Sequence, residues 1–275
     1  MAKLVFDGID LTGSDYNVTA LSATRSSGAP RDMRTQAIPR GEGVAWDMGR
    51  TPRTISVEVA QWGDTPEQFR QRHDRLMRLL NAAEPKSLRL DWAYPDRYWL
   101  VWLANDTPVS AFRQSRFERF RLEFVAPDPY ALSVDEVTAQ LSVDSDPFDF
   151  DLAGGASPAA PVGGSADARP VYVITNDDAE SPSQNPITFV ALENTTTGDK
   201  LTWDGILLEA EQLRIDTDRM LVEFSADGGA TWAAAMAELG DAVAFPRVRP
   251  GVVNEMRLTG VHDGTLDISY RHRFI

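Results

Sequence analysis

Two aspartates in the stretch RIDTDRMLVEF, Asp216 and Asp218, have a spacing that could support chemistry. Paired carboxylates can bind a metal ion or share a proton. They can also shape a tight turn, because an Asp side chain accepts hydrogen bonds from the backbone amides that follow it. Neither a histidine nor a third carboxylate follows at the spacing of metal ligands. The stretch therefore favours a hairpin turn over a metal site.

A second candidate is the segment SADGGATW, which resembles the Asp-box of sialidases and other β-rich proteins. In that motif Ser and Asp stabilise a hairpin turn and Trp packs beneath it, also in the enzymes. The chain contains one copy, and it is too short to hold a propeller beside its first domain. The motif therefore predicts a hairpin and not glycosidase activity. The residues with this structural role are Ser225, Asp227, Gly229 and Trp232.

The other residue types used in catalysis form no recognisable pattern. The chain has no cysteine, which excludes disulfides, thiolate zinc sites, iron–sulfur clusters and cysteine nucleophiles. None of its histidines, His73, His262 and His272, stands in a recognisable Ser/His/Asp arrangement. No glycine-rich phosphate loop leads into a helix. We predict no catalytic residue, no metal and no cofactor, and hence no enzyme.

Arginines are the most suggestive polar residues of the first half. The segment ATRSSGAPRDMRTQAIPRGEG is long, has weak strand character and connects two strands. Long loops in compact domains are often functional, and the planar guanidinium suits protein interfaces. One interpretation is an arm that contacts a neighbouring subunit, and the other is a mobile polar loop. The arginines concerned are Arg25, Arg31, Arg34 and Arg40.

The elements that position these residues differ between the two halves of the chain. In the first half, the alternation in TISVEVAQW and RFERFRLEF predicts strands, and KSLRLDW and RYWLVWLAN continue the pattern. The segment that begins at Pro66 predicts the one helix, capped by Asp64 or Thr65 and ended by Pro85. From residue 169 onwards, short strands with turn signals every 8–12 residues predict a β-sandwich or barrel.

Between these parts, residues 136–168 are rich in Ala, Gly, Ser, Pro and Asp. We interpret this range as an acidic linker, with FDFDL as a possible short strand. The predicted domains are thus 1–135, the linker 136–168, and 169–275.

Charge is distributed unequally between the halves. Residues 1–135 carry 18 basic and 18 acidic side chains, whereas residues 136–275 carry nine and 23 and hold the whole excess of −14. Such a surface repels phosphates and anionic lipids, which argues against nucleic acid or membrane binding by the second half. No apolar run approaches the ~20 residues that span a bilayer, and the start of the chain shows no signal peptide.

Taken in order, several segments resemble the siphophage distal tail proteins, the ring component of the tail tip and baseplate hub. In the first half these are VFDGIDL, FRQRHDRLMRLL, RYWLVWLA and FRLEFVAPDPYAL. In the second half they are NPITFVALENTTTGDKLTW, LRIDTDRMLVEF, FPRVRPGVVNEMRL and LDISYRHRFI. Together these segments cover most of the chain.

The resemblance implies a mostly β protein in two modules. The N-terminal domain would be a tail-tube-like β-sandwich with one α-helix that closes a homohexameric ring, and the C-terminal domain a galectin-like β-sandwich on the outside. The implied location is the virion tail tip, after assembly in the host cytoplasm. Implied partners are the tail tube protein, the tail-hub or tail-associated protein, the tape-measure protein and a receptor-binding protein. The sugar-binding residues of galectins have no counterpart that we can place.

Two alternatives stay open at this point. One is a carbohydrate-binding or cell-wall glycan-acting β-sandwich protein, suggested by the sandwich and by SADGGATW. The other is a different tail tube or hub component. From the resemblance to the distal tail proteins, in contrast, we expect a structural ring with a channel for the tape measure and DNA.

Overall fold

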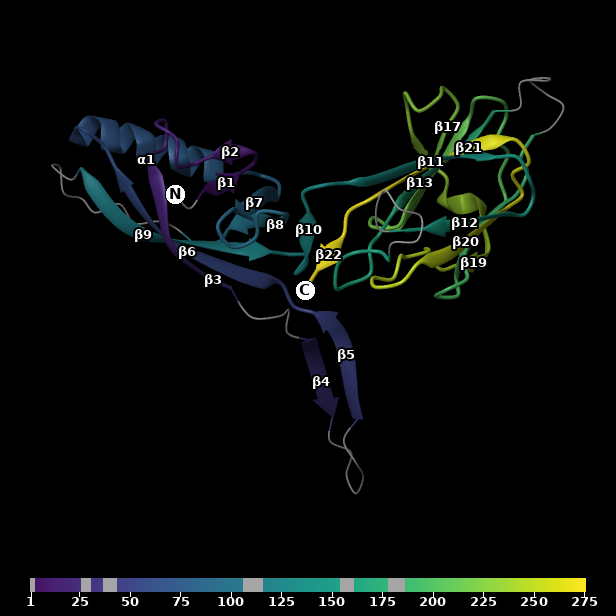
Figure 1. The fold of residues 1–275 in the computed structure, drawn as a ribbon, viewed down its shortest axis with the longest axis horizontal. Helices are drawn as coiled ribbons and strands as arrows, with labels where there is room; N and C mark the ends of the chain where they lie inside the picture. Colours follow the sequence, from purple (N-terminus) through teal and green to yellow (C-terminus); the bar gives the residue numbers. More distant parts are fainter. Residues whose placement is uncertain (1–2, 26–30, 37–43, 106–115, 154–160, 178–185) are drawn as a thin grey trace. The chain divides into compact units, whose positions relative to one another are not determined.

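The computed structural model describes residues 3–25, 31–36, 44–105, 116–153, 161–177 and 186–275. The chain forms two compact units, Met1–Val134 together with Ile275, and Asp135–Phe274. Figure 1 shows the ribbon of both units, coloured along the sequence.

The first unit is built from strands and the one α-helix of the described residues. Its elements are β1 (Leu4–Phe6), β2 (Ile9–Asp10), β3 (Val18–Arg25), β4 (Arg31–Gln36), β5 (Val44–Arg50), β6 (Arg53–Trp62), α1 (Pro66–Leu80), β7 (Lys86–Leu90), β8 (Arg97–Leu103), β9 (Phe117–Ala126) and β10 (Ala131–Ser133). Seven of the strands form a sheet in the order β2-β1-β7-β8-β9-β6-β3, in which β10 pairs with β8. All these pairings are antiparallel.

The sheet folds over at β8 into two layers. The ring of Phe6 on β1 stacks on that of Phe124 on β9, with centroids 6.0 Å apart, so the β1 side packs against one end of the β9-β6-β3 side. Every second residue is buried along β6 and in the second half of β9, as in Ile55, Val57 and Leu122. This alternation is what places one face of each strand in the core.

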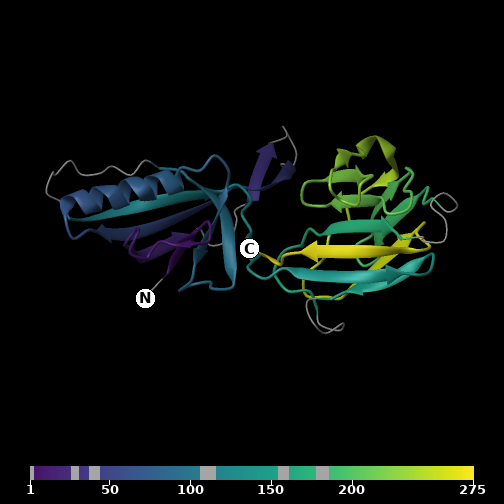
Figure 2. The same cartoon turned by 90° about the horizontal axis from the view of Figure 1, so that it is seen from above.

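Helix α1 covers the other end of the same core face (Figures 1 and 2). Its start has the predicted signals, because the Thr65 hydroxyl accepts a hydrogen bond from the Gln68 amide at 3.2 Å and Pro66 is the first helical residue. Its buried side chains recur at helical spacing, and one of them, His73, meets the ring of Phe120 on β9 edge-on at 5.4 Å.

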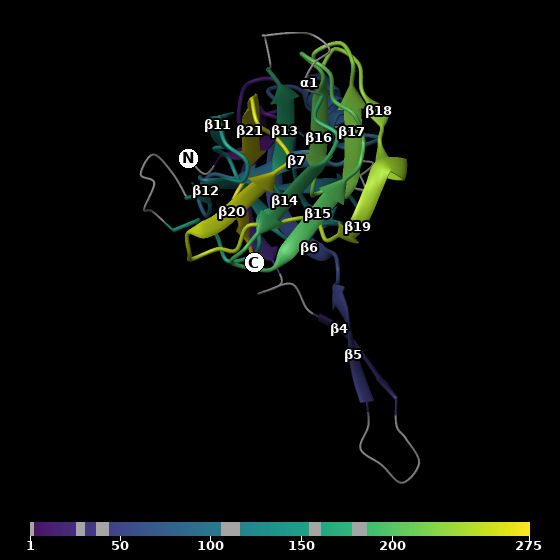
Figure 3. The ribbon, with the colours of Figure 1, turned by 90° about the vertical axis from the view of Figure 1, so that its right-hand side faces the viewer.

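The second unit is a sandwich of two antiparallel sheets (Figure 3). One sheet has the order β11-β21-β13-β16-β17-β18 and the other β12-β20-β14-β15-β19. Apolar side chains of both inner faces, among them Tyr172, Trp203 and Leu258, form one buried cluster. The elements are β11 (Val137–Val143), β12 (Phe148–Leu152), β13 (Val171–Asn176), β14 (Val190–Asn194), β15 (Asp199–Trp203), β16 (Gln212–Asp216), β17 (Leu221–Ser225), β18 (Ala233–Ala234), η1 (Met236–Glu238), β19 (Leu239–Val243), β20 (Asn254–Thr259), β21 (Gly264–Tyr270) and β22 (Arg273–Phe274).

The range 136–168, interpreted from its composition as a linker, differs in the structure. Strand β11 pairs with β21 from Val137↔Tyr270 to Val143↔Gly264, and β12 pairs with β20. The physical reason is the apolar residue at every second position of β11, such as Leu141, which packs on the core of the second unit. Its start therefore belongs to the sandwich, and FDFDL is a strand.

Candidate functional site

Strands β4 and β5 form a hairpin that lies between β3 and β6 in the sequence. They pair with each other as a two-stranded sheet and, among the described residues, with no other strand. Their register continues that of β3 and β6, since Arg25 faces Ile55 and Arg31 faces Arg50. The four strands thus have the registers of one long ribbon, whose inner part belongs to the main sheet. In Figure 1 β4 and β5 run outside that sheet.

The arginines predicted to act at a subunit interface lie along this ribbon. Arg25 is the last residue of β3, and Arg31 and Arg34 belong to β4, where Arg34 faces Trp46. Arg40 lies outside the described residues. The hairpin pairing gives the segment the form of an arm, and its contacts with another subunit remain a prediction.

Arg25 is engaged within its own unit. Its Nη2 atom donates a hydrogen bond of 2.7 Å to the hydroxyl oxygen of Tyr94, and its Cζ lies 4.4 Å from the centroid of that ring. The sequence shows no signal for this contact, because the two residues are 69 positions apart.

The opposite face of the β9-β6-β3 layer from the core is polar. It presents Arg119, Arg121 and Glu123 on β9 and Glu58 on β6, and these are balanced in sign. Arg121 lies 3.2 Å from a carboxylate oxygen of Glu123 and donates to the hydroxyl of Ser56 at 2.9 Å. Phe117 and Trp62, which face each other at one end, are partly exposed. The face can border water without accumulating charge.

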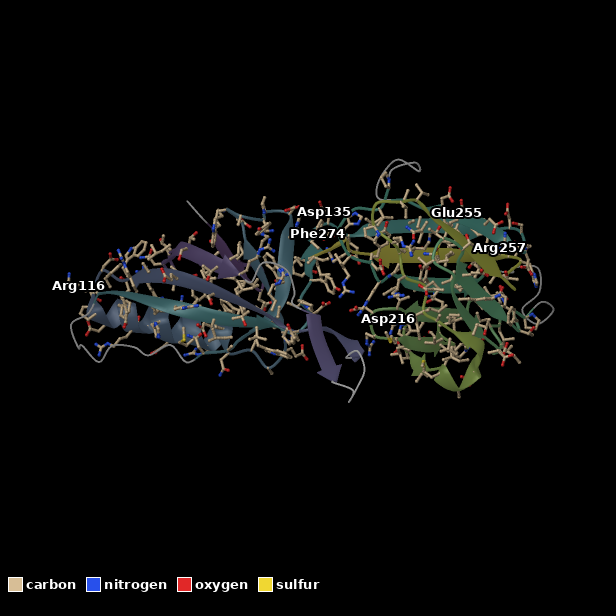
Figure 4. The ribbon with its side chains drawn as sticks, turned by 90° about the horizontal axis from the view of Figure 1, so that it is seen from below. Arg116, Asp135, Asp216, Glu255, Arg257 and Phe274 are labelled. Atoms are coloured by element: carbon tan, nitrogen blue, oxygen red, sulfur yellow. The ribbon has the colours of Figure 1, made fainter. Side chains whose placement is uncertain are left out.

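Asp216 caps the turn between β16 and β17 (Figure 4). Its Oδ1 accepts hydrogen bonds from the backbone amides of Asp218 at 3.0 Å and Arg219 at 2.9 Å. The carboxylate of Asp218 instead lies 3.0 Å from the guanidinium of Arg169. The first carboxylate is therefore occupied by its own turn, and the second by a cation.

The segment from Ser225 to Trp232 is held by a similar network. Asp227 accepts hydrogen bonds from the amide and the hydroxyl of Thr231, and from the hydroxyl of Ser225. These donors, the Thr231 hydroxyl first, lower the pKa of Asp227 to about 2. Gly229 has φ of +91°, and its amide donates to the Ser225 hydroxyl. The ring of Trp232 lies 4.3 Å from the Cζ of Arg214.

The three histidines lie in different environments. His73 is buried between α1 and the sheet, where its Nδ1 lies 3.1 Å from Oε1 of Gln61. His262 is exposed and lies 3.8 Å from a carboxylate oxygen of Asp146, and the ring of His272 meets Tyr270 edge-on. In the described part of the chain, no three His, Cys, Asp or Glu residues come together as metal ligands.

The outer face of the five-stranded sheet has a hollow of about 510 Å³ lined by three carboxylates and one arginine. On its wall Asp151 and Glu255 face each other across β12 and β20, and Arg257 is paired with Asp149 at 2.7 Å. Figure 4 labels Glu255 and Arg257. The pairing with Arg257 holds the pKa of Asp149 below its usual range. Such a face repels anionic ligands. No helix among the described residues is long and apolar enough to cross a membrane.

Comparison with known proteins places this geometry in context. Residues 11–126 match the family model of the phage tail protein RIFT-related domain. The search of curated proteins found no match. Among solved structures, the chain is similar to the Dit protein of phage SPP1, described as a paradigm of the hub adsorption apparatus in phages that infect Gram-positive bacteria. That similarity has a TM-score of 0.72 and 17% identity and covers 100% of both chains.

Two structures of the phage p2 baseplate in its activated conformation, with Sr and with Ca, are also similar. Their TM-scores are 0.53 and 0.52, with 12% and 11% identity over 98% of each chain. At such identities the likeness establishes the fold. The mostly β fold class and the resemblance to siphophage distal tail proteins are thus confirmed.

Proposed function

We propose that this protein, which has the fold of a phage distal tail protein, is a structural component of the distal end of a long non-contractile phage or prophage tail. It would form a hexameric ring that joins the tail tube to the tail-tip apparatus. The observation that carries the proposal is the agreement of fold over the whole chain with the SPP1 protein, together with the phage tail domain matched by residues 11–126. Neither match concerns an enzyme of known activity, and we propose no catalysis.

Ring closure requires a head-to-tail interface whose rotation closes after a fixed number of copies. The first unit is suited to this role because its basic and acidic residues balance, so that charge does not build up as copies converge. The sheet of this unit ends in β2 on one side and β3 on the other, which leaves two edges for neighbours. Each contact should bury on the order of 1,600 Å².

The polar face of the β9-β6-β3 layer is the best candidate for the wall of a central channel. Its two arginines and two glutamates balance in sign, and a wall with balanced charge neither traps nor repels a passing polyanion. Through this channel the tape-measure protein and then DNA would pass.

The arm, which consists of β4 and β5, would add to the contact between adjacent subunits. A two-stranded ribbon that has no other strand partner in the described chain can only be ordered by a neighbour or by its own base. We infer that Arg31 and Arg34 contact the next protomer. The acidic second unit would lie at the periphery, where a receptor-binding protein or a tail-associated protein could dock.

Two arm substitutions test the proposal. Replacing both Arg31 and Arg34 by Glu should leave a folded chain that no longer forms rings, because the charge of the arm is reversed. Replacing the helix arginines Arg70 and Arg75 by Glu is the matched control, since both are exposed on α1. Electron microscopy and size-exclusion chromatography report the assembly. Rings formed equally well by the arm variant would reject the role of the arm, and their absence in the unmodified protein would reject the ring.

A further inference from the structure

The base of the arm is held by a cation–aromatic cluster. Arg25 ends β3, and beyond it the chain continues towards β4. Its guanidinium meets the face of Tyr94 and donates to the hydroxyl of the same ring. The Cζ of Arg25 is also 5.8 Å from the ring of Trp99. A cation over aromatic rings and a hydrogen bond to one of them act together on this side chain.

The surface that receives Arg25 is packed into the first unit. Trp99 on β8 is fully buried, and Tyr94 meets it edge-on with centroids 5.7 Å apart. The backbone of Tyr94 is fixed as well, because its amide donates to Leu90 and its carbonyl accepts from Arg97. The side chain of Arg97 lies on the same ring, 5.8 Å from its centroid. Tyr94 is thus part of the body of the unit.

The other strand of the ribbon is anchored differently. Ile55 faces Arg25 across the β3–β6 pair and is fully buried in the core. The β6 side of the base is therefore held by hydrophobic packing, and Arg25 adds a side-chain contact on the β3 side to the pairing of the two strands. Without Arg25, this pairing alone would fix the β3 side where the arm begins.

We propose that Arg25 is a positioning residue, which fixes the direction in which the β4–β5 hairpin leaves the body by binding Tyr94. This role differs from that of a residue in direct contact with a neighbouring subunit. Only the expected effect on assembly rests on the proposed function: an arm held in one direction binds a neighbour with less loss of conformational freedom.

The direction of the arm can be measured without any ring. Because the chain has no cysteine, two can be introduced for spin labels, at Asp47 on β5 and at exposed Gln71 on α1. Labelled protein is diluted with excess unlabelled protein, and the distance distribution is measured by pulsed electron resonance. Arg25→Ala and Tyr94→Leu should broaden it, and Tyr94→Phe, which keeps the ring, should broaden it less. The control, Arg70→Ala, removes an exposed arginine from α1 and should leave it unchanged.

Assembly gives the second readout. The protein concentration for half-maximal ring formation should rise about tenfold in Arg25→Ala and in Tyr94→Leu, and not further in the double variant. Circular dichroism verifies folding of each variant. Distributions as narrow as in the unmodified protein would overturn the proposal, as would additive effects on assembly, which would place Arg25 on the neighbour. If neither the unmodified protein nor any variant forms rings, the proposed ring is rejected. The distance measurement then still tests whether Arg25 positions the arm.

Discussion

The carboxylates of Asp216 and Asp227 both stabilise turns. Each accepts hydrogen bonds from the backbone of the turn that follows it; Asp216 is the last residue of β16, and Asp227 lies in the turn after β17. A carboxylate oriented by amides in this way stabilises a turn. The residue types and spacing were sufficient to favour this interpretation over metal binding.

Replacing Asp216 tests this role directly. Asp216→Ala removes the acceptor for two amides and should lower the free energy of unfolding of the second unit by about 1–2 kcal/mol. Asp216→Asn keeps an oxygen at the same place and should cost much less. Urea titration measures both. A metal site would behave differently, because Asn would then be as harmful as Ala and a chelator would destabilise the unmodified protein.

Protonation of the buried His73 should make the stability of the first unit depend on pH. Burial lowers its pKa below 6.5, although the nearby carboxylates of Glu118 and Asp74 act in the opposite direction. The unfolded chain therefore takes up this proton first. The stability that neutral His73 contributes is present above pH 6.5 and is lost as the pH falls from there towards the folded-state pKa.

The dependence can be isolated by substitution. In His73→Phe the loss of stability of the first unit below pH 6.5 should be smaller than in the unmodified protein, because the titrating group is gone. His262→Asn, at an exposed position of the second unit, is the control and should leave the profile unchanged. Thermal denaturation at a series of pH values measures it. Parallel profiles for His73→Phe and the unmodified protein would contradict this account.

At the scale of elements, local patterns predicted most of what the structure has. Helix α1 had a cap, a proline at its first position and apolar residues at helical spacing, so it could be assigned without tertiary information. Strand β11 was hidden because the surrounding range is rich in Ala, Gly and Asp, and composition was given more weight than alternation. The β4–β5 hairpin was hidden for a different reason, because the segment that forms it has weak strand character although its paired residues are close in sequence. The Arg25–Tyr94 contact had no sequence signal because the two residues are 69 positions apart.

Strand β11 can be tested as an element of the sandwich. Leu141→Ala should lower the free energy of unfolding of the second unit by about 1–3 kcal/mol, because this side chain packs on the core. The neighbouring Gln140 is exposed on the opposite face, so Gln140→Ala should change it by less than about 0.5 kcal/mol. Denaturant unfolding followed by tryptophan fluorescence compares them. Equal, negligible effects would mean that residues 137–143 act as a linker.

At the scale of the whole molecule, charge and fold lead to the same account. A balanced first unit can be packed against copies of itself, whereas an acidic second unit is disfavoured at a crowded centre. The division into a helix-bearing β module and an all-β module was predictable from strand patterns. The proposed assembly could not be derived from the patterns, since an interface depends on the shapes of two surfaces and on residues whose types alone do not mark an interface.

The most direct test of the ring is the mass of the assembled protein. Native mass spectrometry of the purified chain should show a species of about 182 kDa, which is six times 30.4 kDa. A species that stays at 30.4 kDa at high protein concentration would contradict the account.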